Sequence, residues 1–473
     1  MWHGGFAPRV GVAYAVSDKT VVRAGYGLFY TQAFYPGWGG GVSLDGFNPS
    51  VAFNNSLGGY EPAFYMDSGF PAYSKAPDIS LTADNGKNGP SYRPAYANHL
   101  SNTQQWNLTI EHKFGQKGFA SVAYVASKGT HLPSSMQPLN VLNPSLLSMG
   151  SELNAVFTPT TASLYGVSQP YSGWAQQLLN GSCAPTVAQA LVPYPQFCGG
   201  LTGINENQGT SHYNSLQAKY GRNFASGLYM EANYTLSRLT TNAASTTQSA
   251  QAGYGAIGNI INPYQDSRNI SLSPDDIPNM VSVMAVYDLP FWKGKQLLNN
   301  DGVLAHLAGG WTVASTMKFT SGMPLYFWDS SVCGLPGQFR AVCIPGISGQ
   351  VLAQSWGGFD VNRPAFNASA FEPASAFNGF YLGTGPRVSN VRGSPYRDVN
   401  LSLARKFAIK ERLNFEIRAE AFNVFNLHYF TCDGQAFGDC IPFNNDPSSA
   451  SFGSWNGTVT QPRNIQLVGR ITF

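Results

Sequence analysis

Apolar and polar residues alternate with a period of two along much of this chain, a pattern typical of strands with one apolar and one polar face. The clearest segment runs from Leu413 to Ala421. Its odd-numbered positions are Leu, Phe, Ile, Ala and Ala, and the positions between them are Asn, Glu, Arg and Glu. One face of this strand is therefore apolar throughout, while the other carries four polar residues, three of them charged.

The same alternation predicts about eleven strands, most of them 9–13 residues long. Strands of globular proteins average about 5–6 residues, whereas a strand that crosses a bilayer needs about 9–11. The lengths therefore favour an all-β protein built as an antiparallel transmembrane barrel. The expected strands are Arg9–Val16, Lys19–Tyr30, Thr103–Phe114, Lys117–Ser127, Ser211–Phe224, Gly227–Arg238, Asn279–Leu289, Gly310–Thr320, Arg397–Phe407, Leu413–Ala421 and Asn464–Phe473.

The expected connections alternate in length along the chain. Four are tight turns, at residues 16–19, 114–117, 224–227 and 407–410, and the intermediate link Pro290–Gly309 falls in the same set. The others are long and rich in Gly, Pro and Asn: Thr31–Asn102, Lys128–Thr210, Thr240–Pro278, Ser321–Tyr396 and Asn426–Gln461. Short turns on one side and long loops on the other are typical of an outer-membrane barrel, whose turns are periplasmic and whose loops are extracellular.

Composition agrees with this interpretation. Charged residues make up 11% of the chain against a usual quarter, while aromatic residues reach 13% and there are 51 glycines. Strands and turns are favoured over helices, and the high aromatic content argues against disorder. The net charge of +3 gives no case for a nucleic-acid partner. No apolar run reaches the roughly 18–20 residues of a transmembrane helix.

The six cysteines form three local pairs, all within the long connections. The pairs are Cys183 with Cys198, Cys333 with Cys343, and Cys432 with Cys440. We predict three short-range disulfides, which require an oxidising compartment and so agree with extracellular loops. Free thiols are the alternative, and zinc is disfavoured because no C-x-x-C motif or paired His spacing accompanies the cysteines.

Several segments resemble Oar-like TonB-dependent receptors. Ala7–Tyr14 with Thr20–Tyr30 resembles a stretch inside these barrels, Asn414–Asn426 resembles their penultimate strand, and Pro462–Leu467 with the terminal Ile471–Phe473 resembles their last strand. The resemblance implies a barrel of about 22 strands, filled by a plug domain. Residues 1–473 would then form the C-terminal part of the receptor barrel, an up-and-down barrel with about 11 of the 22 strands, without plug and signal peptide.

Charged residues on the polar strand faces are expected to point into the lumen. A charge that faces hydrocarbon at mid-bilayer costs about 2–4 kcal/mol, so such side chains must face water or protein. In a plugged barrel they would bind the plug through charge-assisted hydrogen bonds. Generic solvation of the lumen is the alternative for each of them. The residues concerned are Arg23, Glu111, Lys113, Glu231, Lys318, Glu416, Arg418, Glu420 and Arg470.

The favoured function is uptake of a large or scarce substrate across the outer membrane, driven through TonB by the inner-membrane energy complex, which would act on the absent plug. A barrel without energy coupling, acting as a pore or surface binder, is the first alternative. A secreted all-β adhesin or carbohydrate-binding protein is the second. No catalytic constellation, metal site or cofactor motif is found, so we expect no enzyme activity. Substrate contacts are expected from long-loop aromatics: Trp38, Tyr60, Tyr65, Trp174 and Trp328.

The expected partners also include outer-membrane lipid and the barrel-assembly machinery. The resemblance implies that this machinery reads the terminal aromatic Phe473 as an assembly signal. Deleting Phe473 from the full-length parent should therefore sharply reduce the heat-modifiable, protease-protected barrel in outer-membrane fractions. Phe473→Tyr or Phe473→Trp should be tolerated because the ring is what matters. An unchanged amount of barrel after the deletion would rule out the assembly role.

Overall fold

The computed structural model of the chain describes the wall of a curved sheet and parts of the connections on one side of it. The described residues are 5–30, 53–55, 57–71, 82, 84–87, 99–132, 139–181, 183–198, 201, 208–224, 227–243, 264–292, 295, 297–300, 302–327, 344–373, 383–410, 413–431 and 442–473. Among them, no helix is long and apolar enough to cross a membrane.

Eleven long antiparallel strands form the wall, each hydrogen-bonded to the next long strand in the chain. They are β1 (Arg9–Ser17), β2 (Thr20–Tyr30), β3 (Asn102–Phe114), β4 (Gly118–Leu132), β5 (Gly209–Asn223), β6 (Leu228–Thr241), β8 (Asn279–Asp288), β9 (Trp311–Thr320), β10 (Tyr396–Lys410), β11 (Leu413–Phe422) and β14 (Asn464–Thr472). The short β7 (Ser271–Leu272) pairs with the end of β6, and β12 (Phe430–Thr431) pairs with β13 (Thr458–Val459). The predicted all-β antiparallel wall is confirmed, with the expected strand order.

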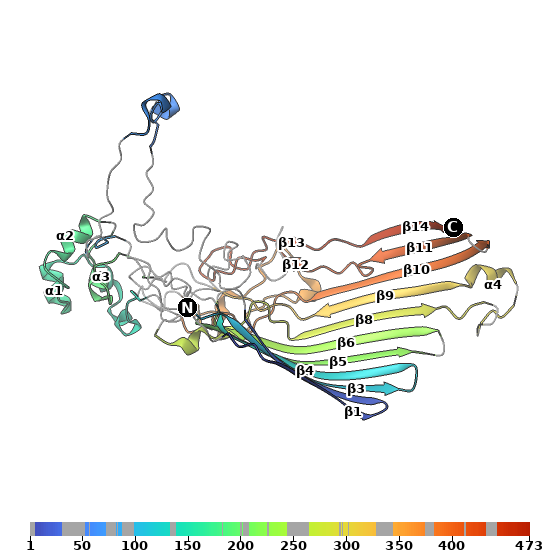
Figure 1. Cartoon of the computed structure of the whole chain (residues 1–473). Helices are drawn as coiled ribbons and strands as arrows, with labels where there is room; N and C mark the ends of the chain where they lie inside the picture. Colours follow the sequence, from blue (N-terminus) through green and yellow to red (C-terminus); the bar gives the residue numbers. More distant parts are fainter. Residues whose placement is uncertain are drawn as a thin grey trace.

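The sheet is open, with one edge at β1 and the other at β14 (Figure 1). Each of these strands pairs on one side only, and every residue of both is exposed. Phe473, just beyond β14, is 99% exposed. An unpaired edge leaves a row of backbone donors and acceptors, which water can satisfy but hydrocarbon cannot.

The two ends of the wall carry different kinds of connection, as the alternation of connection lengths predicts (Figure 1). The tight turns lie at the right in the figure, together with the helix α4 (Val303–Ala308) of the β8–β9 link. Those parts of the long connections that the structure describes lie at the opposite end. At the β3–β4 turn Gly115 adopts a φ of 61°, in the left-handed region that glycine enters without steric cost.

The long connections contain helices that the sequence pattern does not predict. Between β4 and β5 lie the 3₁₀ segment η4 (Pro144–Asn154) and the helices α1 (Pro159–Tyr165), α2 (Trp174–Leu179) and α3 (Val187–Leu191). Shorter 3₁₀ turns elsewhere are η2 (Leu57–Gly59), η3 (Met66–Ser68), η7 (Asp266–Asn269), η8 (Trp356–Gly358) and η9 (Ala368–Ala370). These helices are all short, and the α-helices have five to seven residues, too few for a recognisable 3.6-residue repeat.

Strand register divides the wall into two faces. Residues opposite each other in an antiparallel ladder point to the same side, as do alternate residues along one strand. Arg23 pairs with Thr109, and Glu111 follows two residues later, so all three share one face. Continued from strand to strand, this parity places every Asp and Glu of the long strands on that side, which we call the charged face.

The opposite side, which we call the apolar face, exposes large aliphatic and aromatic side chains. Leu108, Ile110, Val122, Leu216 and Leu236 are each between 44% and 49% exposed, although they stand on interior strands of the sheet. A continuous apolar surface of this kind is unfavourable in water and suits lipid.

Five long basic side chains also stand on the apolar face, several of them close to strand ends: Lys128, Arg222, Arg238, Arg397 and Arg405. Chains of this length can reach toward the polar headgroups while their stems stay in apolar surroundings.

Nitroxide labels at Phe415 and Glu416 test the two faces directly, since these neighbours point to opposite sides of β11. With the protein reconstituted in lipid vesicles, the label at Phe415 should be relaxed more by oxygen, which dissolves in the bilayer. The label at Glu416 should be relaxed more by a water-soluble nickel chelate. The same response at both positions would contradict the assignment of faces.

Candidate functional site

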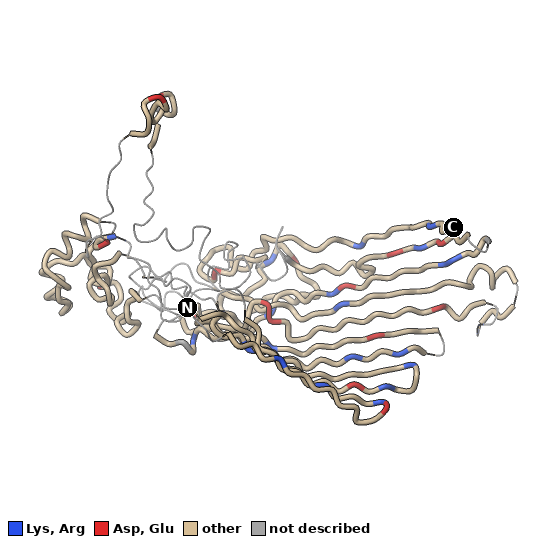
Figure 2. Tube along the Cα trace, viewed as in Figure 1, with Lys and Arg blue, Asp and Glu red and all other residues tan. Residues whose placement is uncertain are grey.

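Ion pairs cross neighbouring strands on the charged face. Figure 2 marks the positions of the charged residues along the Cα trace. Arg23 Nη1 lies 2.5 Å from Glu111 Oε2 between β2 and β3, and Lys219 Nζ lies 2.9 Å from Glu231 Oε1 between β5 and β6. Tyr229 donates a hydrogen bond of 3.2 Å to the Glu231 carboxylate. Cross-strand charge pairs stabilise the sheet, and here their side chains remain partly exposed, which leaves them able to accept further partners.

A denser cluster covers β11 and its neighbours. The Arg418 guanidinium donates to Glu416 at 2.5 Å and to Glu420 at 3.3 Å, so the cation stands between two carboxylates on one strand. Glu420 also accepts a hydrogen bond from Gln466 of β14, and Lys406 of β10 lies 3.9 Å from Glu416. Alternating charge of this kind offers donors and acceptors close together, which suits binding to another polar protein surface.

All nine charged residues expected to face the lumen stand on the charged face: Arg23, Glu111, Lys113, Glu231, Lys318, Glu416, Arg418, Glu420 and Arg470. Arg23 and Glu111 meet directly, as do the three residues of β11. Lys318 instead lies over the ring of Tyr396, and Arg470 stands opposite Glu416 in the ladder.

Five further charged residues that the sequence pattern did not single out share the charged face: Arg9, Lys219, Asp288, Asp398 and Lys406. Each lies in a predicted strand, so counting alternate positions from its charged neighbours would have found them.

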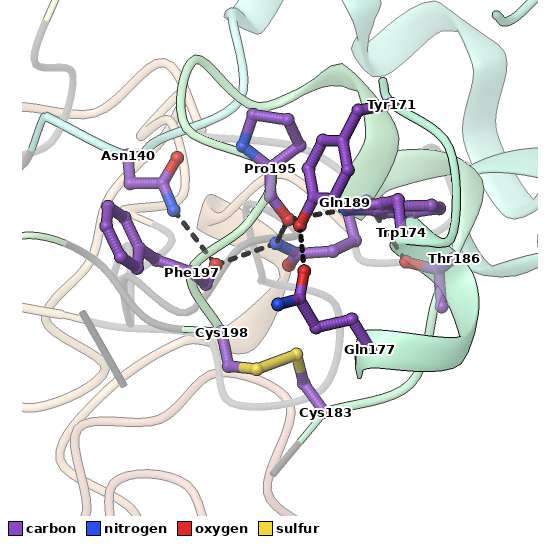
Figure 3. The surroundings of a disulfide bond; sticks show 10 residues. All are labelled: Asn140, Tyr171, Trp174, Gln177, Cys183, Thr186, Gln189, Pro195, Phe197 and Cys198. Atoms are coloured by element: carbon purple, nitrogen blue, oxygen red, sulfur yellow. Dashed lines mark hydrogen bonds between the residues drawn. A yellow bond between two sulfur atoms is a disulfide. The ribbon is translucent and has the colours of Figure 1, made fainter. Parts of the chain in front are cut away.

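The connection between β4 and β5 folds into a small unit with its own core, shown around its disulfide in Figure 3. Trp174 at the start of α2 is fully buried against Phe157, Leu178 and Val187. Its indole Nε1 donates to the carbonyl of Pro195 at 2.8 Å (Figure 3). Trp174 is therefore a core residue, and the expectation that it contacts substrate is wrong: the small core requires a large apolar side chain at this position.

A disulfide closes this unit. Cys183 and Cys198 are bonded, with their Cα atoms 5.4 Å apart, as their spacing predicts. The other four cysteines, Cys333, Cys343, Cys432 and Cys440, lie outside the described residues, as do Trp38 and Trp328. Tyr60 and Tyr65, also expected as ligand contacts, are 93% and 69% exposed.

A turn from the first long connection docks on the unit. Gly86 N donates to Gln196 O, and Cys198 N donates to Lys87 O, both at 2.8 Å. Gly86 has a φ of 76°, and a Cβ at this position would meet the Gln177 carbonyl oxygen at 2.5 Å. Only glycine fits such a position without displacing the backbone. Two of the long connections are therefore held together here.

An open pocket of about 910 Å³ lies at this junction. Its lining is rich in amide and hydroxyl groups: Thr82, Asn85, Lys87, Tyr171, Ser172, Gly173, Gln176, Gln177, Asn180, Gly181, Gln196 and Phe197. Burial raises the pKa of the Tyr171 phenol, which stays protonated and donates to Gln177 at 2.5 Å. Side-chain amides both donate and accept hydrogen bonds, so the pocket suits a ligand with many hydroxyl or amide groups, and Lys87 adds one positive charge to the lining.

Two arginines, the buried Arg387 and the half-buried Arg392, tie other connections to the wall, and no sequence signal marked them. Arg387 is 1% exposed and donates to the carbonyls of Thr241 at 2.9 Å and Asn242 at 3.3 Å. Burial lowers the pKa of Arg387 to about 10, so the group remains charged at neutral pH. Arg392 reaches the buried Asp276 carboxylate at 2.6 Å. Both contacts anchor residues 383–394 beside the loop end of β6.

The family model described as "outer membrane beta barrel domain" matches residues 1–466. The chain belongs to this family and is a protein of the outer membrane, which confirms the predicted fold and location. The second alternative, a secreted adhesin or carbohydrate-binding protein, is thereby set aside. No curated protein matches the sequence.

Solved outer-membrane structures resemble the chain weakly. The ferripyoverdine receptor of Pseudomonas aeruginosa, bound to ferripyoverdine, is 11% identical over 99% of this chain and 33% of its own, with a TM-score of 0.37. The unliganded ferric citrate transporter FecA is 10% identical over 98% of this chain and 38% of its own, with a TM-score of 0.38. The outer-membrane transporter YddB from Escherichia coli is 10% identical over 98% of this chain and 40% of its own, with a TM-score of 0.40. The chain spans two fifths or less of these proteins, and likenesses at this level carry no argument on ligand or mechanism.

Removing the disulfide should loosen the β4–β5 unit without affecting the wall. For a closed loop of about 15 residues the cross-link contributes about 3 kcal/mol, so Cys183→Ser/Cys198→Ser should accelerate protease cleavage within residues 139–201 by roughly a hundredfold. Ser172→Ala, an exposed change in the same unit, is the matched control and should leave the cleavage rate unaltered. Equal rates in the double variant and the control would show that the core alone holds the unit.

Proposed function

We propose that this chain forms the C-terminal half of the wall of a TonB-dependent outer-membrane receptor, with the charged face lining the lumen and holding a plug. The observation that carries the proposal is the separation of charge across the wall. All strand carboxylates stand on one face, while exposed aliphatic side chains cover the other. In a bilayer the apolar face must meet lipid, so the charged face turns inward.

The lumen charges leave hydrogen-bonding capacity that a plug could use. Arg23 and Glu111 are paired, yet their side chains are still 52% and 42% exposed, and Lys406 of the β11 cluster is 76% exposed. A polar plug surface can satisfy their remaining donors and acceptors with charge-assisted hydrogen bonds.

The two free edges support the role of a half-wall. The eleven-strand sheet has unpaired backbone groups along β1 and β14, and such edges are not tolerated in hydrocarbon. Further strands must therefore close the barrel in the membrane. A barrel of 22 strands, as in plugged outer-membrane transporters, would need as many again.

Uptake would begin at the extracellular connections. The amide-lined pocket between Asn85 and Gln177 offers a first contact for a polar substrate that is too large or too scarce for diffusion through general pores. Energy would reach the plug through TonB and release the substrate into the periplasm. A barrel without energy coupling is the competing function, in which the lumen stays open.

Photocrosslinking in the native outer membrane tests the plug. A benzophenone amino acid at Gln217, on the charged face in the middle of the wall, should crosslink to a plug segment of the full-length receptor. The same group at the neighbouring Leu216, on the apolar face, should label lipid and serves as the matched control. Absence of any protein crosslink at Gln217, with lipid labelling intact at Leu216, would contradict a plugged lumen.

Planar bilayer recordings separate the receptor from the open pore. The full-length protein should conduct little until mild urea unfolds the plug, and conductance should fall again on dilution. A large, steady conductance without urea would favour the pore without energy coupling.

A further inference from the structure

The β8–β9 link leaves apolar side chains unusually exposed at the end of the wall that carries the tight turns. Val303, Leu304 and Leu307 of helix α4 are 75%, 70% and 66% exposed. Residues 302–310 include no Asp, Glu, Lys or Arg. An uncharged helix that turns three aliphatic side chains outward is poorly suited to the aqueous periplasm.

Hydrogen bonds hold α4 on the apolar side of the wall. The carbonyl oxygen of Leu307 accepts from Trp311 Nε1 at 3.0 Å and from Arg405 Nη1 at 3.1 Å. Trp311 and Arg405 are partners in the β9–β10 ladder, and both stand on the apolar face. The helix therefore continues the surface that meets lipid and does not cover the lumen.

An aromatic cage surrounds Arg405 beside α4. Its guanidinium carbon lies 5.1 Å from the ring centroid of Trp292, 5.9 Å from that of Trp311 and 4.5 Å from that of Phe407. Arg405 is only 6% exposed. Tryptophan with arginine is the combination that proteins place at the boundary between hydrocarbon and headgroups.

A recess of about 370 Å³ adjoins this cage. Trp292, Lys295 and Trp311 line it together with Asp288 and others.

We propose that α4 and the Arg405 cage form a foot that inserts into the headgroup region of the periplasmic phospholipid leaflet. The occupant of the exposed aliphatic surface is the bilayer itself, because the surface is continuous with the lipid-facing wall and carries no charge. The foot fixes the depth of the β8–β9 link and would anchor this side of the barrel. The inference rests on the outer-membrane location and is independent of energy coupling, so either can fail without the other.

Depth measurements on the full-length protein in phosphatidylethanolamine–phosphatidylglycerol vesicles test the foot. A nitroxide on Leu304→Cys should be relaxed at least severalfold more by oxygen than by a nickel chelate. The matched control is Gln116→Cys in the β3–β4 turn at the same end of the wall, where the chelate should dominate. If the Leu304 label is as accessible to the chelate as the Gln116 label, the foot does not enter the bilayer and the proposal fails.

Placing a charge on α4 provides a second test of the foot. With the nitroxide on Val303→Cys, the change Leu304→Asp should expel α4 and raise chelate accessibility severalfold, whereas Leu304→Ala should change it little. Heat-modifiable migration of every variant shows that the barrel has folded. An unchanged accessibility in the Leu304→Asp variant would overturn the proposal.

Discussion

The need to satisfy every backbone hydrogen bond without water is the constraint on which this structure depends. In hydrocarbon an unpaired amide costs several kcal/mol, so the membrane-spanning part of the chain is restricted to long strands in continuous register. The long strands pair their backbone groups along the whole wall, but the outer edges of β1 and β14 have no partner strand. The open edges are thus the strongest physical reason to expect further strands in the membrane-inserted protein.

Register turns a linear alternation into two chemically distinct surfaces. A shift of one residue in any ladder would move its carboxylates into lipid, so the burial of charge selects a single pairing. The ion pairs on the charged face, such as Lys219 with Glu231, depend on that pairing because they join different strands. At the end of the wall that carries the tight turns, lipid headgroups and water replace hydrocarbon, so a charge on the apolar face is tolerated there. Arg405 stands on that face among tryptophan rings.

The connections outside the membrane are stabilised in the same way as small secreted domains. A core around Trp174, a disulfide and the buried Arg387 hold connections that have few strands of their own. Small units of this kind bury too little apolar surface to be stable without such cross-links. The amide-lined pocket arises where two of these connections meet, which links the receptor function we propose to the rigidity of the loops.

Alternation and connection length in the sequence determined the strands, their order and the separation of short turns from long loops. They also determined the face of residues such as Arg23 and Glu416. A period of two is a local property of the chain, and a charge placed on the lipid side is energetically costly. Tertiary structure alone decided which charges meet, that Trp174 is core, that Gly86 docks beside Gln177, and that α4 lies against the apolar face. Those contacts join positions far apart in the chain or lie in helices too short to leave a periodic signal, and no local pattern encodes them.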